Sequence, residues 1–192
     1  SMHFDKLGAE FNAFTSKEYT CYYARFVDDR LEDALSVLAE MVIDSVFAQD
    51  AIDTEREVVL EEIARSEDAP DDYVFELYSS KTFENHPLGL PVLGSRELVS
   101  SYTHDDCRNF HDTHYHAGNL VLAAAGNVDH DALVKLTQKH FESMKPGIKA
   151  QRVLDKPTFN SGVYSATRDT EQAQLIYGFP WFGVGDERRY IG

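Results

Sequence analysis

Two glutamates in a segment with helical periodicity, residues 54–67, are the side chains best placed to do chemistry. At about 100° per residue, Glu55 and Glu62 lie about 20° apart on the helix surface. They border an apolar stripe formed by Ile52, Val59 and Ile63. A carboxylate at the edge of a core needs a cation, a hydrogen-bond donor or a metal as a partner, because burying a bare charge costs free energy.

The same pattern is also typical of an acidic helix with a solvated outer face. Glu57 and Glu61 lie on the opposite side of the predicted helix and fit this alternative. Spacing alone does not choose between a site and a solvated face.

A second group of candidate ligands comprises His104, Cys107, His111, His114 and His116. Cys107 and His111 are four residues apart on a predicted helix, so thiolate and imidazole could share a metal on one face. The spacing of the histidines is not a standard zinc signature, and the neighbouring aspartates favour a polar surface helix.

Composition narrows the classes of function. The 192 residues include 33 acidic and 18 basic side chains, giving a net charge of −15, which disfavours nucleic acid as a partner. The charge suits basic peptides or cations as partners, but it is equally typical of a protein that acidic side chains keep soluble. The longest apolar run, residues 120–125, is too short to span a membrane, and the first residues do not resemble a signal peptide. With only two cysteines, the sequence predicts a reducing compartment, the cytoplasm or an organelle interior. Nucleophile-elbow, phosphate-loop and dinucleotide motifs are absent.

The pattern of apolar residues predicts an α+β fold. The expected sheet is antiparallel-rich and mixed, joining a hairpin over Glu10–Val27 to a buried strand over Asn119–Gly126, with helices packed on one face. The expected helices cover residues 31–47, 54–67, 71–83, 104–115 and 129–144. A linker is expected at 146–157, followed by a second hairpin over 162–168 and 172–181.

Four stretches in order resemble the M16 zinc metallopeptidases, the family of pitrilysin, insulysin and the mitochondrial processing peptidase. The first resembles a G-x-x-x-N-A-[FY]-T strand and the second an E-R-x-V-[IV]-L-x-E-[IM] helix. The stretches are LGAEFNAFTSKE (7–18), TEREVVLEEI (54–63), HPLG with VLG (86–94), and NLVLAAAGNVDH (119–130).

The resemblance implies a role for each matched residue. Glu62 matches the distal glutamate that supplies the third zinc ligand, and Glu55 matches the acidic catalytic-site neighbour that supports it. A substrate peptide is expected to pair with an edge strand by β-augmentation. The residues matching that strand are Asn12, Ala13, Phe14 and Thr15.

The family's zinc motif H-x-x-E-H, which provides two histidine ligands and the catalytic base, does not occur in these 192 residues. Counting back from Glu62 by the family's spacing passes residue 1, so we expect an N-terminally truncated domain. Residues 1–145 would form most of the first M16 domain, 146–157 a linker, and 158–192 the opening hairpin of the second domain.

The resemblance thus implies an inactive part of a zinc-dependent metalloendopeptidase that acts on peptides or presequences. Its implied partners are a peptide substrate, the remaining M16 domains or a homologous subunit, and a second copy of the chain. Two alternatives stay open: a non-catalytic M16-like structural or peptide-holding subunit, and an unrelated acidic interaction domain.

Overall fold

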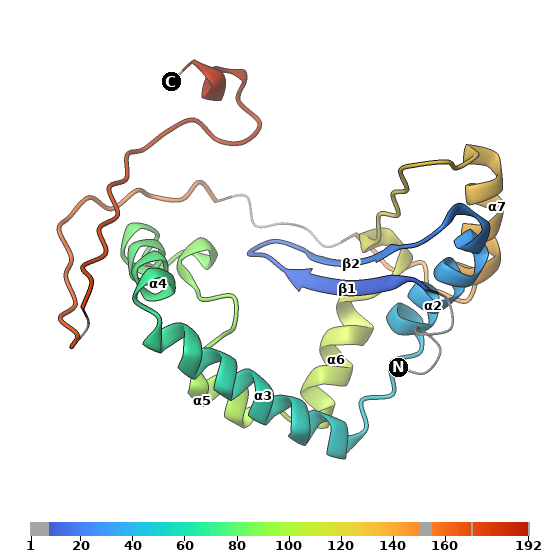
Figure 1. Cartoon of the computed structure of the whole chain (residues 1–192), viewed down its shortest axis with the longest axis horizontal. Helices are drawn as coiled ribbons and strands as arrows, with labels where there is room; N and C mark the ends of the chain where they lie inside the picture. Colours follow the sequence, from blue (N-terminus) through green and yellow to red (C-terminus); the bar gives the residue numbers. More distant parts are fainter. Residues whose placement is uncertain (1–7, 150–154, 170, 192) are drawn as a thin grey trace. The chain divides into compact units, whose positions relative to one another are not determined.

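The structure of the chain is a computed structural model that describes residues 8–149, 155–169 and 171–191 (Figure 1). The described elements belong to two compact units: unit 1 comprises residues 1–56 and 101–153, and unit 2 comprises residues 57–100 and 154–192. The strands and α-helices are β1 (Glu10–Thr15), β2 (Thr20–Arg25), α2 (Leu31–Ile43), α3 (Gln49–Asp68), α4 (Pro70–Thr82), α5 (Arg96–Ser101), α6 (His104–His114) and α7 (His130–Phe141). Short 3-10 helices are η1 (Asp28–Arg30), η2 (Pro87–Gly89), η3 (Ala117–Asn119) and η4 (Glu187–Tyr190).

The predicted first hairpin is present in unit 1. Strands β1 and β2 pair antiparallel, with Ala13 opposite Tyr22. The turn closes with a 2.8 Å hydrogen bond from the Ser16 amide to the Tyr19 carbonyl. Aromatic and β-branched residues on both strands favour this pairing.

The predicted strand over Asn119–Gly126 is wrong as a member of this sheet. Residues 120–126 are not assigned to a strand, and within the described residues the sheet has the two strands β1 and β2 alone. The segment is also not buried, since Val121 is 88% exposed. Its apolar composition favours a buried strand, but a ladder also needs a neighbour with free backbone groups.

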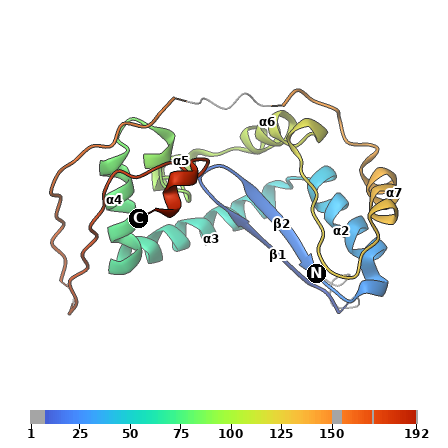
Figure 2. The ribbon, with the colours of Figure 1, turned by 90° about the horizontal axis from the view of Figure 1, so that it is seen from above.

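The core of unit 1 is built on α2. Its buried residues recur at helical spacing, as the sequence predicts. They are Ala34, Leu35, Ala39 and Val42. This face packs against β2 and α7 (Figure 2). On the surface, a hydrogen bond from Lys139 of α7 lowers the pKa of the Glu32 carboxyl of α2.

A capping box begins α6. The Thr103 side-chain oxygen accepts a hydrogen bond from the Asp106 amide at 3.2 Å, and the Asp106 carboxylate accepts one from the Thr103 amide at 2.9 Å. These two bonds satisfy amides that the helix itself leaves without partners. The Thr103 hydroxyl and amide together lower the pKa of the Asp106 carboxyl.

Replacing Thr103 by alanine removes the cap and is expected to lower the free energy of unfolding by about 1 kcal/mol. Thr113→Ala, an exposed position of the same helix, is the control and should change it little. Urea unfolding followed by circular dichroism measures both. Because folding lowers the pKa of Asp106, the contribution of its carboxylate to the free energy of unfolding is complete above about pH 4. That contribution disappears as the pH falls through the pKa of Asp106 in the folded state. Equal stability of the two variants would contradict this role for the cap.

In unit 2, α4 follows the end of α3 after a single residue, Ala69. Pro70 occupies the first turn of α4, where its missing amide hydrogen costs nothing. Ile63 of α3, Thr82 of α4 and Val99 of α5 are buried.

The C-terminal part of unit 2 is extended. Residues 155–169 and 171–182 run in opposite directions (Figure 1), but no strand is assigned there. The first run is tied to α4 by the Asn160 amide, which donates to the Thr82 carbonyl at 3.0 Å. The Arg168 guanidinium lies 3.8 Å from the centre of the Tyr73 ring. The predicted second hairpin therefore lacks its ladder in the described residues, and residues 150–154 of the predicted linker lie outside them.

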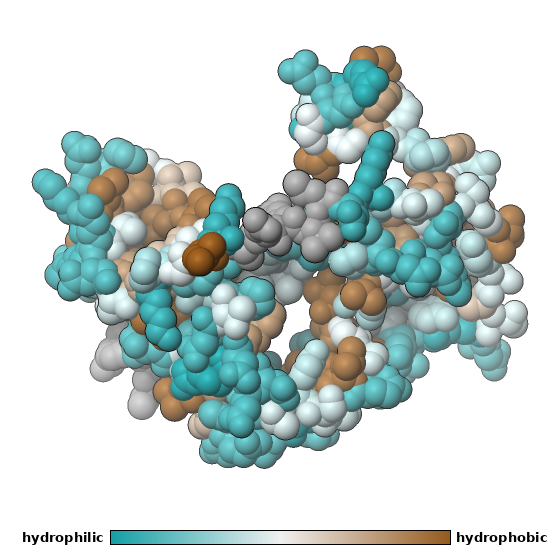
Figure 3. All heavy atoms as spheres, turned by 180° about the vertical axis from the view of Figure 1, so that it is seen from behind, coloured by the Kyte–Doolittle hydropathy of each residue, from teal (hydrophilic) through white to brown (hydrophobic). Residues whose placement is uncertain are grey.

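Polar side chains dominate the face shown in Figure 3, with apolar ones in scattered patches. In the described part of the chain, every helix is too short or too polar to cross a bilayer.

Candidate functional site

The α3 helix places Glu55 and Glu62 as the sequence predicts, at the border of an apolar stripe. Ile63 is 5% exposed and Ile52 and Val59 are half-buried, whereas both glutamates are exposed. Neither carboxylate forms a hydrogen bond or an ion pair with any described residue. Two unpaired carboxylates on one side of a helix are available to an external ligand.

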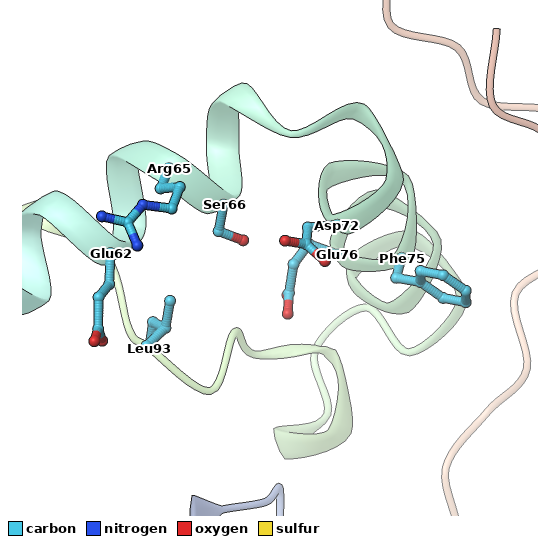
Figure 4. A pocket seen from close by; sticks show the side chains of 7 residues that line it. All are labelled: Glu62, Arg65, Ser66, Asp72, Phe75, Glu76 and Leu93. Carbon is cyan, nitrogen blue, oxygen red and sulfur yellow. The ribbon is translucent and has the colours of Figure 1, made fainter. Parts of the chain in front are cut away.

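Glu62 lines a pocket of about 400 Å³ in unit 2, between the end of α3 and the start of α4. Its lining residues are Glu62, Arg65, Ser66, Asp72, Phe75, Glu76 and Leu93. Figure 4 shows Asp72 pointing from α4 toward Ser66, with Glu76 on the same side of α4, and the Glu62 side chain extending beside Leu93, whereas the Phe75 ring points away.

The pocket carries an excess of negative charge, with three carboxylates against the single guanidinium of Arg65. Asp72 and Glu76 are four residues apart and therefore share one face of α4. Like Glu62, they form no hydrogen bond or ion pair within the described residues. The arrangement attracts a cationic group beside Glu62.

The sequence did not single out Asp72 or Glu76. Their place beside Glu62 depends on the turn between α3 and α4, and a proline at residue 70 predicts the break but not the angle across it. The one available signal was the i, i+4 spacing of two acids shortly after the break.

The four residues matched to the substrate strand, Asn12–Thr15, lie in β1 and are all exposed. The Ser16 amide bonds to the Tyr19 carbonyl, so these two residues form a hydrogen-bonded pair of the ladder. Hydrogen-bonded and non-hydrogen-bonded pairs alternate along an antiparallel ladder. Ala13 and Thr15 therefore belong to non-hydrogen-bonded pairs and direct their backbone groups to the outer edge of β1. The Asn12 side-chain oxygen accepts the Ala13 amide at 2.8 Å. An incoming strand would replace that local hydrogen bond.

Phe14 lies on the open face of the hairpin, with 47% of its surface exposed. The centre of its ring lies 5.8 Å from that of Tyr19, which it meets edge-on, and 6.3 Å from that of Tyr23. Phe14 is therefore not a buried core aromatic in unit 1.

The group of four histidines and Cys107 on and just after α6 does not assemble into a metal site of three or more ligands. His111 is 7% exposed and its Nε2 lies 2.8 Å from the Val42 carbonyl oxygen, so this nitrogen donates a hydrogen bond. The described residues contain no group of three or more His, Cys, Asp or Glu side chains arranged to hold a metal ion. Cys107 and His111 therefore have no third ligand among the described residues, and His111 serves the core of unit 1.

Two family models match the chain. Residues 1–96 match Insulinase (Peptidase family M16), and residues 101–191 match the Peptidase M16 inactive domain. The chain belongs to peptidase family M16. The recognition made from four short motifs is confirmed, and so is the α+β fold class.

Curated M16 relatives are named as zinc proteases. The chain is 43% identical to an uncharacterised zinc protease of Bacillus subtilis over 97% of its length, and 42% identical to one of Rickettsia felis over 92%. It spans 45% and 42% of those two proteins, less than half of each.

Two solved structures share the fold. A protease from Helicobacter pylori matches with a TM-score of 0.71 at 25% identity, over 81% of this chain and 38% of that one. A peptidase M16 inactive domain from Pseudomonas fluorescens matches with a TM-score of 0.74 at 21% identity, over 82% of this chain and 38% of that one.

Proposed function

We propose that this M16 chain is part of a zinc-dependent metalloendopeptidase that hydrolyses peptides or presequences. It would contribute the third zinc ligand, Glu62, and the substrate-binding strand Asn12–Thr15. The observation that carries the proposal is the unpaired Glu62 carboxylate at the acidic pocket, in a chain similar to proteins named zinc proteases.

The residues of this chain fit only part of a zinc site. Catalytic zinc uses three protein ligands and keeps one position for water or substrate, and a glutamate oxygen is a common ligand. Glu62 supplies one such oxygen, but the described residues hold no group of three ligands and the sequence lacks H-x-x-E-H. The chain alone therefore cannot complete the site. When bound, zinc would activate water and polarise a carbonyl.

Glu55 would support the site from two helical turns earlier. It lies on the same side of α3 as Glu62 and has no competing partner in the described residues. Carboxylates near a metal site orient ligands and tune their basicity. We therefore assign Glu55 to the catalytic site as the supporting acid.

The substrate would bind as an added strand on the outer edge of β1. The exposure of Asn12–Thr15 and the outward backbone groups of Ala13 and Thr15 support this mode. Main-chain pairing supplies affinity with little sequence selectivity, and side-chain pockets supply specificity.

The wider organisation belongs to the same proposal. Residues 1–145 would form most of the first M16 domain, 146–157 a linker and 158–192 the opening of the second. The zinc histidines would come from an upstream segment, and the partners would be the remaining M16 domains, a homologous subunit or a second copy. The cytoplasm is the proposed location.

The acidic pocket favours substrates with a basic residue near the bond to be cleaved. Asp72→Asn with Glu76→Gln is expected to lower kcat/KM of the full-length protein for an arginine-containing peptide about fivefold, because exposed ion pairs contribute up to ~1 kcal/mol. The value for the matched glutamine peptide should not change. Asp71→Asn, exposed and outside the pocket, is the control. An equal loss on both peptides would contradict a role in selectivity.

A non-catalytic, peptide-holding M16 subunit is the second candidate, favoured by the match of residues 101–191 to the Peptidase M16 inactive domain. A peptidase assay of the full-length protein separates the two. Activity that a zinc chelator removes and added zinc restores supports the enzyme. Peptide binding without hydrolysis supports the subunit.

A further inference from the structure

Two tyrosine hydroxyls join the hairpin of unit 1 to α6. The Tyr22 hydroxyl of β2 lies 2.9 Å from the hydroxyl of Tyr115, the residue that ends α6. The rings meet edge-on, with centres 6.3 Å apart and planes at 69°. Both residues are half-buried, and Tyr22 is the cross-strand partner of Ala13.

Tyr115 is itself held against the core. Its ring stacks on His111 with centres 4.6 Å apart and planes at 22°. His111 Nε2 donates to the Val42 carbonyl at 2.8 Å, which ties α6 to the last turn of α2. Burial and the Tyr22 hydroxyl raise the pKa of Tyr115 far above its usual range, so the hydroxyl stays protonated and can donate.

A two-stranded sheet has little stability of its own, so the hairpin relies on its neighbours: β2 packs on α2, and Tyr22 bonds to Tyr115 at the end of α6. Tyr22 and Ala13 occupy the same register position, so a shift at Tyr22 moves the backbone groups of Ala13 at the outer edge. A one-residue change in strand register would also exchange the faces of the strand.

We propose that Tyr115 is a positioning residue. Through its hydrogen bond to Tyr22 it holds β1 in the position in which an extended peptide can pair with the backbone of Ala13. This rests on the proposed function of Asn12–Thr15 as the substrate strand. Neither hydroxyl belongs to the metal-binding residues assigned above, so the effect is expected on peptide binding and not on zinc.

The test uses the 192-residue chain and a fluorescent, arginine-containing decapeptide, with binding measured by fluorescence anisotropy. Tyr115→Phe and Tyr22→Phe each remove one hydroxyl and keep the ring. Each variant is expected to raise the Kd about three- to tenfold, the effect of losing one hydrogen bond. The double variant should be no weaker than either single, because all three lack the same bond.

Two further variants complete the design. Tyr177→Phe removes a hydroxyl from a ring that is 79% exposed and should leave the Kd unchanged. Ala13→Pro removes the outward amide while keeping the ladder to β2, since an edge strand accepts proline at such a position, and should abolish binding. The thermal midpoint of each variant separates positioning from general destabilisation.

Equal Kd values for the wild type and Tyr115→Phe, with binding lost in Ala13→Pro, would overturn the positioning role alone. A rise in Kd that follows the loss of thermal stability, and equally affects any other destabilised variant, would also overturn it. No binding by the wild type, or binding unchanged in Ala13→Pro, would overturn the assignment of the strand and this inference with it.

Discussion

Replacing Glu62 by glutamine in the full-length protein is expected to lower zinc affinity and peptidase activity by at least about a hundredfold. The side chain keeps its shape but loses its negative charge and its capacity to act as a strong oxygen ligand. Altering a residue that only supports the ligands lowers metal affinity or activity by about 10- to 100-fold, and Glu55→Gln should have an effect of this size. Zinc per chain after dialysis and kcat/KM measure both effects.

Glu57→Gln is the matched control. It makes the same chemical change on the same helix, at an exposed position outside the acidic pocket. Zinc content and activity should match those of the wild type. Equal losses in the Glu57 and Glu62 variants would mean that charge on α3, rather than a ligand at Glu62, is responsible.

The largest expected effect on stability follows from replacing Leu35 by alanine. Leu35 is 4% exposed on the buried face of α2, the helix that contacts both β2 and α7, so truncating it leaves a cavity in the core of unit 1. Truncating a buried leucine lowers the free energy of unfolding by about 2–5 kcal/mol. Urea unfolding of the 192-residue chain measures the difference.

Leu175→Ala is its control, since the same atoms are removed from a side chain that is 89% exposed. Its free energy of unfolding should change by less than about 0.5 kcal/mol. If Leu35→Ala were equally mild, α2 would not be the centre of this core.

The longer helices could be predicted from periodicity. The observed α2 and α6 begin at Leu31 and His104, where the sequence places them, because apolar spacing and start signals agree there. Helix α3 begins at Gln49, five residues before the segment that the sequence predicts. Asp53 and Thr54 resemble helix-start residues, but in the structure Asp53 accepts a hydrogen bond from Gln49 inside the first turns.

Features that depend on neighbours could not be predicted. The run 119–126 has strand-like composition, yet composition does not supply a pairing partner. Helix α5 has six residues, too few to show a period. Asp72 and Glu76 join Glu62 only through the angle between α3 and α4.

The apolar stripe beside Glu55 and Glu62 could be predicted, because the rotation per residue of a single helix determines which side chains share a side. Every residue involved lies on α3, so no long-range contact is needed to place them. Chemistry confined to one helix is therefore readable from sequence, whereas the same chemistry spread over two elements is not.

The most direct test of Glu62 as a zinc ligand is a crystal structure of the full-length protein with anomalous data at the zinc absorption edge. We expect a zinc peak about 2.0–2.2 Å from a Glu62 carboxylate oxygen, with two histidines completing the protein ligands. A zinc ion fully coordinated by other residues, with the Glu62 carboxylate outside its coordination shell, would contradict the account.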